Sequence, residues 1–169
     1  MDTLEAIHTR RSIRKYTDEP VSEETIETLL RAAMAAPSAG NEQPWHFVVI
    51  DDRKLLDEIP KFHPYSAMLK GARVAILIAG DLSLETYEGY WVQDCSAATQ
   101  NLLLAAHAEG LGAVWLGVHP VEERETGMRK LLGIPDNVIP FSLIALGYPA
   151  EQKGREDRYQ AGRVRRNGW

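Results

Sequence analysis

The stretch WVQDCSAATQNLLLAAHAEGLGAVWLGV, residues 91–118, decides the fold of this chain. Its first part predicts the longest helix, over residues 90–109, because apolar side chains recur there at helical spacing. These apolar positions are Val92, Cys95, Leu102, Leu103 and Ala106. Gly110 follows as the expected C-cap, since glycine readily adopts the left-handed backbone that ends many helices. The apolar run over residues 113–118 then predicts a buried strand.

Outward from this stretch, the sequence predicts helices and strands in alternation. Helices are expected over residues 4–9, between Ser22 and Pro37, over 53–59 and over 121–132, and strands over 46–51, 74–79 and 138–146. Thr3 and Ser22 are the expected N-caps of the first two helices. Four strands that alternate with helices indicate an α/β or α+β layered architecture. Since the sequence contains no repeat, linker or low-complexity segment, we expect residues 1–169 to form one domain.

The composition excludes several classes of protein. Hydrophobic residues make up 44% of the chain and charged residues 25%, which is ordinary for a globular protein. A net charge of −5 argues against a general nucleic-acid binder, which would carry a basic face. Cys95 is the single cysteine, so an internal disulfide is impossible and a reducing compartment fits. Because neither a signal peptide nor an apolar run of ~20 residues is present, we expect a soluble, cytoplasmic protein without nucleic-acid or membrane partners.

Common catalytic and metal-binding motifs are missing. The five histidines show no short ligand spacing, so no metal site is expected. Neither a G-x-S-x-G elbow nor a P-loop occurs. Gly110 and Gly112 resemble the start of a dinucleotide fingerprint, but they precede a strand instead of opening a helix. A helix cap and a tight turn explain them better.

Two basic segments could bind a phosphate. In TRRSIRKY, residues 9–16, Arg10, Arg11 and Arg14 stand with the Ser12 hydroxyl on a segment without helical periodicity. Guanidinium groups match phosphate oxygens bidentately, although a solvated basic loop is the alternative. A second pair of cations, Lys153 and Arg155, follows the last strand. Beyond it the arginine-rich tail contains Tyr159, Val164 and Trp169, so we expect the tail to dock onto another surface rather than to remain solvated.

The segment PSAGNEQPW, residues 37–45, combines two prolines, a glycine and two amides with a tryptophan. Pro37 ends the preceding helix, and Trp45 leads into an apolar strand. The segment is therefore expected to be a rigid polar loop, and a turn with incidental amides is the alternative to a binding role.

Together, in this order, the motifs resemble the FMN-dependent nitroreductase family. The resemblance rests on RRSIRKY (10–16), PSAGNEQPWHF (37–47), the helix QDCSAATQNLLLAAHAEGLG (93–112), AVWLG (113–117), ALGYP (145–149) and the basic C-terminal tail. It implies an α+β fold in which helices flank a mixed central sheet. It also implies an intertwined homodimer with two FMN sites at the subunit interface and an exchanged C-terminal extension, residues 148–169.

The resemblance also assigns cofactor contacts. Arg10, Arg11 and Ser12 would hold the FMN phosphate and ribityl chain, and Lys153 and Arg155 would close on the phosphate from the other end of the chain. Arg14 would lie near the flavin N1–C2=O edge, where a fixed cation stabilises the negative charge of the reduced ring. The ring itself would lie against Trp115, Leu116 and Gly117. The partner subunit's flavin would be contacted by Pro37, Ser38, Ala39, Asn41 and, more weakly, Gln43.

The implied reaction is ping-pong hydride transfer, in which NAD(P)H reduces FMN and a nitroaromatic, quinone or similar electron-poor acceptor then oxidises it. No side chain is expected to act as a catalytic acid or base, because FMN carries the chemistry. Ala39 stands where many relatives have a serine, residues 64–66 offer no clear flavin ligand, and a long helical insertion over the site is missing. The alternatives are a reductive dehalogenase or flavin-fragmenting enzyme on this scaffold, a non-catalytic flavin sensor and a cofactor-free interaction domain.

Overall fold

The computed structural model describes residues 1–169 and confirms the predicted order of helices and strands. Its main elements are α1 (Thr3–Thr9), α2 (Glu23–Met34), β1 (Trp45–Ile50), α3 (Arg53–Glu58), β2 (Val74–Asp81), α4 (Trp91–Ala108), β3 (Gly112–Gly117), α5 (Glu122–Leu132) and β4 (Val138–Gly147). Ser22 caps α2 as expected, since its side chain accepts a hydrogen bond from the Thr25 N–H. The cap expected at Thr3 was wrong. Asp2 takes that position and accepts from the N–H groups of residues 4 and 5.

The four strands form one sheet in the order β1-β2-β4-β3, and every neighbouring pair is antiparallel. The α+β class is confirmed, but the sheet differs from the mixed sheet that was expected. The parallel pairing in this chain is a single bridge between Ser12 and Ala113. Hydrophobic periodicity marks which residues form strands, but it carries no information on strand direction.

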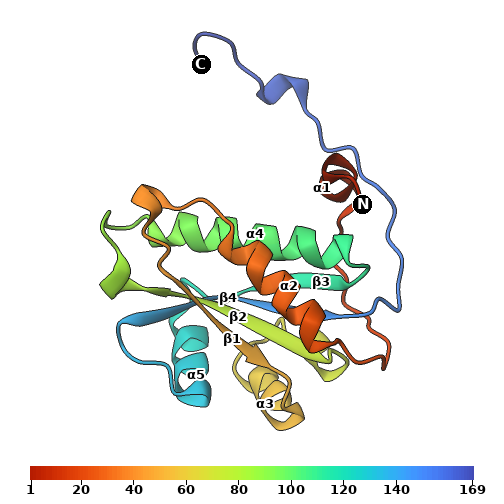
Figure 1. Cartoon of the computed structure of the whole chain (residues 1–169), viewed down its shortest axis with the longest axis vertical. Coiled ribbons are helices and arrows are strands. Elements are labelled where there is room, and N and C mark those ends of the chain that lie inside the picture. The colour runs from red at the N-terminus through yellow and green to blue at the C-terminus, as the bar shows by residue number, and fades with distance from the viewer.

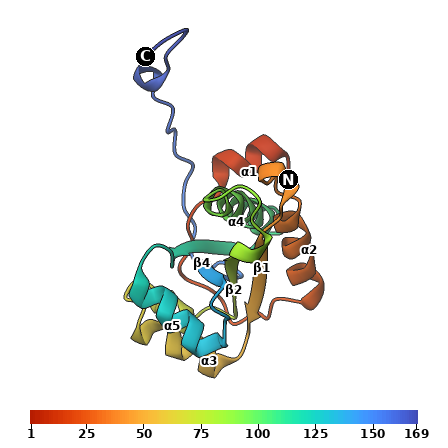
Figure 2. The same cartoon turned by 90° about the vertical axis from the view of Figure 1, so that its left-hand side faces the viewer.

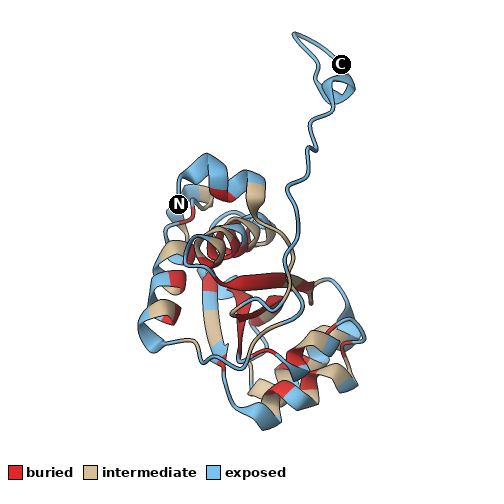
Figure 3. Cartoon of the chain, turned by 90° about the vertical axis from the view of Figure 1, so that its right-hand side faces the viewer, coloured by how far each residue is buried: buried red, intermediate tan, exposed pale blue.

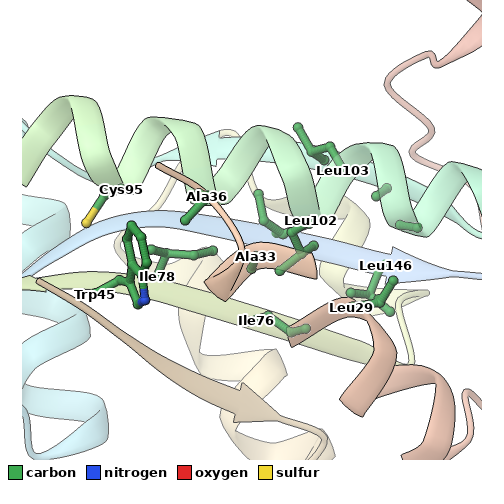
Figure 4. Close-up of a cluster of buried hydrophobic side chains, with 14 of the residues drawn as sticks. Leu29, Ala33, Ala36, Trp45, Ile76, Ile78, Cys95, Leu102, Leu103 and Leu146 are labelled. Carbon is green, nitrogen blue, oxygen red and sulfur yellow. The ribbon is translucent and has the colours of Figure 1, made fainter. Parts of the chain in front are cut away.

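Helices cover both faces of the sheet (Figures 1 and 2). Helices α2 and α4 cover one face, where Leu29, Ile76 and Leu102 belong to a buried apolar cluster (Figure 4). Helices α3 and α5 cover the other face, where Leu77 and Met128 belong to a second cluster. All eight residues of β2 are buried because this central strand is covered on both sides.

The chain leaves the body of the molecule after β4 (Figures 1 and 3). Residues 152–169 are exposed throughout, including the apolar Val164 and the fully exposed Trp169. Neither buried cluster includes a residue from this tail. None of the helices combines the length and the apolar composition needed to cross a lipid bilayer.

Candidate functional site

The arginine-rich segment at residues 10–14 runs along the outer edge of β3. Ser12 pairs with Ala113, and the Ile13 N–H donates to the Ala113 carbonyl at 3.0 Å. This close approach depends on Gly112, because a Cβ atom there would lie only 2.5 Å from the Ile13 Cγ2 atom. The strand therefore fixes the backbone from which the arginine side chains project.

The first cavity, of about 470 Å³, lies between this segment and the C-terminal tail. Arg10, Arg11 and Arg155, three of the predicted phosphate ligands, line it together with Arg158. Burial lowers the pKa of Arg10, and the nearby charges of Arg158 and Arg11 lower it further. So many cations in one place favour an anion between them.

A carboxylate already occupies part of this cationic surface. Glu156 accepts hydrogen bonds from Arg11 at 2.6 Å and from Arg158 at 2.8 and 3.0 Å. These hydrogen bonds, that of Arg158 first, and the charge of Arg11 hold the pKa of Glu156 below its usual range. The side chains can therefore bind an oxyanion with several charge-assisted hydrogen bonds, which is the chemistry that a phosphate requires.

Lys153 and Ser12 lie outside this cavity. The Lys153 ammonium donates to the Ser12 carbonyl at 2.6 Å. Lys153 also lines an adjoining cavity of about 340 Å³, together with Arg11 and His107. In this chain Lys153 thus holds the backbone of the arginine segment. The fourth cation of the phosphate cavity is Arg158, which the sequence did not single out.

A third cavity, of about 440 Å³, brings together the residues expected near the flavin ring. It is lined by Arg14, Trp115, Leu116 and Gly117, and also by His63, Pro64, Tyr65, Ala67, Met68 and Arg124. Gly117 leaves space on this side of β3, because an added Cβ atom would meet no atom within 4 Å. Two guanidinium groups beside an indole and open backbone suit a flat aromatic ligand with negative charge on its edge.

His63 and Arg124 hold this part of β3 in place, and the sequence analysis identified neither. Both donate to the Gly117 carbonyl, His63 from Nε2 at 3.0 Å and Arg124 from Nη1 at 2.8 Å. Burial lowers the pKa of His63, so the neutral ring donates from Nε2 and leaves Nδ1 as an acceptor. Arg124 also lies over the Tyr65 ring, 5.3 Å from its centroid. No motif marks these contacts in the sequence. His63 lies 54 residues from Gly117, and Arg124 lies seven residues beyond it, across the turn that follows β3.

The loop at residues 37–43 has an unusual backbone that is held by hydrogen bonds within the loop. Gly40, Asn41 and Gln43 all have positive φ angles, of 52°, 58° and 49°. The Gln43 N–H donates to the Ser38 hydroxyl at 3.0 Å, and the Gln43 amide donates to the Asn41 side chain at 2.9 Å. A side chain at residue 40 would collide with the Tyr87 ring. One hydrogen bond thus joins the two side-chain amides of the loop, and its backbone is one that few sequences can adopt.

Within one chain, this loop does not join the arginine cavities. The Ala39 N–H donates to Asp94 at 3.0 Å, near the start of α4, whereas Thr9 contacts His107 at 2.8 Å, near its end. The helix rises about 20 Å between these two contacts, at ~1.5 Å per residue. The two groups lie at opposite ends of α4 (Figure 1). No residue of the loop lines any of the three cavities described above.

Comparisons with known proteins agree over nearly the whole chain. The sequence model described as “Nitroreductase family” matches residues 7–68 and 61–148. A curated protein of Methanothermobacter thermautotrophicus, named as an NADH dehydrogenase/NAD(P)H nitroreductase, is 57% identical over 169 residues, which are 100% of this chain and 88% of the relative. A crystal structure of a protein of the same name from Parabacteroides distasonis has a TM-score of 0.95 and 45% identity, covering 99% of this chain and 98% of the other. A nitroreductase of Desulfovibrio desulfuricans solved in complex with FMN has a TM-score of 0.86 and 37% identity, covering 100% and 98% of the two chains.

Proposed function

The chain belongs to the nitroreductase family, and from this premise we propose that it is a homodimeric, FMN-dependent oxidoreductase. It uses NAD(P)H to reduce nitroaromatics, quinones or related electron-poor acceptors in a ping-pong reaction. One observation carries the proposal: the segment from Arg10 to Arg14 connects a cavity lined by four arginines with a cavity lined by Trp115 and Gly117. A ligand with a phosphate at one end and an aromatic ring at the other fits this pair of cavities.

The four arginines hold the phosphate end. Arg10, Arg11, Arg155 and Arg158 present guanidinium groups to the same cavity. Glu156 lies among them and gives way to the phosphate, which offers more acceptor oxygens and more negative charge than a carboxylate. Lys153 keeps the Ser12 backbone in place.

The ring end is held by contacts that orient the cofactor and by positive charge. Trp115, Leu116 and Gly117 contact the ring, and Arg14 provides a cation at the edge where negative charge gathers on reduction. The two-electron transfer between NAD(P)H and the acceptor is the chemistry that FMN supplies when bound. Donor and acceptor use the same open face in turn, so side chains need only orient them.

The loop at residues 37–43 completes the site of the other subunit. Its distance from the arginine cavities along α4 supports this arrangement, because a loop on the same chain would have to reach from the opposite end of the helix. The exposed tail, with Val164 and Trp169, then packs against the partner. Neither subunit alone completes a site, and the dimer is obligatory for cofactor binding.

An anaerobic titration tests the proposed reaction. Freshly purified protein is expected to be yellow, to bleach when NADH or NADPH is added, and to regain its colour when a quinone or nitroaromatic follows. The visible flavin absorption reports both half-reactions. A colourless protein that remains so after incubation with FMN would overturn the proposal, as would a flavoprotein that neither nucleotide reduces.

Replacing Gly117 with valine tests the placement of the ring. The valine methyl groups would extend into the cavity without a clash with the protein, since open space surrounds an added Cβ atom. We expect the FMN dissociation constant to rise at least about tenfold, or ~1.4 kcal/mol, while the melting temperature stays close to that of the unmodified chain. Flavin fluorescence and thermal unfolding measure the two effects.

Gly71→Val is the matched control, because Gly71 is exposed, has room for a side chain and lines none of the described cavities. FMN binding that is unchanged in Gly117→Val would place the ring elsewhere.

A further inference from the structure

Two carboxyl groups, those of Glu42 and Asp94, meet where the 37–43 loop contacts α4. One oxygen of each has ordinary partners. Asp94 Oδ1 accepts from the Ala39 N–H at 3.0 Å, and Glu42 Oε2 accepts from the N–H groups of Thr86 and Tyr87 at 2.6 and 3.1 Å. The other two oxygens, Asp94 Oδ2 and Glu42 Oε1, are shielded from solvent and have no hydrogen-bond donor. A side-chain hydrogen bond can nevertheless join the two carboxyl groups.

The surroundings disfavour a negative charge on both carboxyl groups. Asp94 is 4% exposed, and the charges that act on it, from Glu42 and Glu85, are both negative. Cys95 follows Asp94 on α4 and remains a neutral thiol, because burial raises its pKa to about 12. The Tyr87 side chain packs on Gly40 and provides no positive charge. Two adjacent carboxylates without a cation repel strongly in such a place.

We propose that Asp94 is protonated at neutral pH and donates from Oδ2 to Oε1 of Glu42, so that one shared proton fastens the 37–43 loop to α4 and to residues 86–87. This proton gives both unpartnered oxygens the hydrogen bond that they lack, which a buried polar atom requires. Through Ala39 the bond reaches the middle of the loop, and through Glu42 it reaches the N–H groups of Thr86 and Tyr87. Asp94 and Glu42 are thus positioning residues for the loop.

The environment decides which of the two groups carries the proton. Burial raises the pKa of Asp94, and the hydrogen bond and negative charge of Glu42 raise it further, against the single N–H of Ala39. For Glu42, burial acts in the same direction, but the N–H groups of Thr86 and Tyr87 and the bond from Asp94 outweigh it and lower the pKa. Glu42 is therefore the ionised acceptor and Asp94 the acid.

A pH dependence follows from this assignment. Folded Asp94 keeps a proton that the unfolded chain releases near the ordinary pKa of aspartate. The shared proton therefore stabilises the folded state fully below that ordinary pKa, and this stabilisation is lost as the pH rises through the raised pKa of the folded chain. Above it, two carboxylates repel each other and the loop is released. Since the proposed function places this loop on the partner's flavin, FMN affinity should then fall.

Three variants test the role of the proton in FMN binding. In Asp94→Asn the amide can donate to Glu42 and accept from Ala39 without titrating, whereas Asp94→Ala can do neither. Glu88→Gln is the matched control, because it removes an exposed carboxylate of the same segment that makes no hydrogen bond. The FMN dissociation constant is measured on the full chain from about pH 6 to about pH 10, a range above the ordinary pKa of carboxyl groups.

We expect the unmodified chain and Glu88→Gln to lose affinity as the pH rises. At neutral pH, Asp94→Asn should bind FMN within about twofold of the unmodified chain, and its affinity should not show the fall at alkaline pH that loss of the Asp94 proton causes. Asp94→Ala should bind FMN at least about tenfold more weakly than the unmodified chain, or ~1.4 kcal/mol. An Asp94→Asn variant that binds as weakly as Asp94→Ala would show that an ionised Asp94 is needed and would overturn the proposal. An alkaline decline that is the same in Asp94→Asn and in the unmodified chain would do so as well.

Infrared spectroscopy detects the proton without reference to FMN. The flavin-free chain should show, at neutral pH, the C=O stretch of a protonated carboxyl group that is missing from Asp94→Asn. If the chain fails to bind FMN, the proposed function fails while this band still decides whether the proton is shared. A difference spectrum without the band would overturn the shared proton even in a chain that binds FMN normally.

Discussion

A chain that ends after Glu151 is expected to fold and yet to lose both its FMN and its partner. The truncation removes Lys153, Arg155 and Arg158, together with the exposed apolar side chains of the tail. Each charge-assisted hydrogen bond to a phosphate contributes about 1.5–3 kcal/mol, so the loss of two arginines alone predicts at least about hundredfold weaker binding of FMN. The body should still fold because both buried clusters lie within the part that remains.

Three measurements separate these effects: far-UV circular dichroism for the fold, sedimentation for the mass, and flavin fluorescence for FMN. The full-length variant Arg166→Ala is the control, since Arg166 belongs to the tail but does not line the phosphate cavity. It should remain a yellow dimer. A truncated chain that is still a dimer with bound FMN would contradict the roles proposed for the tail.

Replacing Arg10 and Arg11 together with alanine should weaken FMN binding strongly while leaving the dimer intact. The double variant loses two of the four guanidinium groups in the phosphate cavity but keeps the tail and its apolar side chains. We expect the FMN dissociation constant to rise more than about hundredfold, by the same 1.5–3 kcal/mol for each charged hydrogen bond. The dimer should persist, although loss of the contacts from Arg11 to Gly154 and Glu156 loosens the start of the tail.

Arg31→Ala controls for the loss of an arginine in general, because Arg31 forms an exposed ion pair with Glu27 on α2, away from the cavities. Equilibrium dialysis against FMN and sedimentation give the two readouts. A double variant that binds FMN with unchanged affinity would show that the phosphate binds outside this cavity. One that becomes monomeric would show that the arginines act mainly on the tail.

Local features of the fold could be predicted from the sequence. Helix α4 and strand β3 follow from the spacing of apolar residues and from the glycine that separates them, and Ser22 marks the start of α2 through a single local hydrogen bond. At α1, both Asp2 and Thr3 can cap a helix, so composition alone does not choose between them. The strand directions depend on long-range pairing, which periodicity does not contain.

For the candidate site, the sequence identifies residue types but not their grouping in space. The arginine segment and the rigid loop are visible as motifs, whereas the separation of the two along α4 appears only in three dimensions. His63 acquires its position from a hydrogen bond to Gly117, far along the chain, and Arg158 lines the same cavity as Arg10 and Arg11 only because the tail folds back toward the N-terminal segment. The pairing of Glu42 and Asp94 is equally hidden, because each is an ordinary acidic residue until the fold buries one oxygen of each without a hydrogen-bond donor.

Helix α4 carries the loop at one end and the arginine segment at the other, and this has a consequence for inheritance in the proposed dimer. A substitution in the loop of one subunit disrupts the cofactor site of its partner, whereas a substitution of the arginines in the phosphate cavity disrupts the site of the same subunit. When two such subunits pair, both defects fall on the same site, and the other site is assembled entirely from intact parts. Two alleles that are each inactive alone would therefore complement one another within a single mixed dimer.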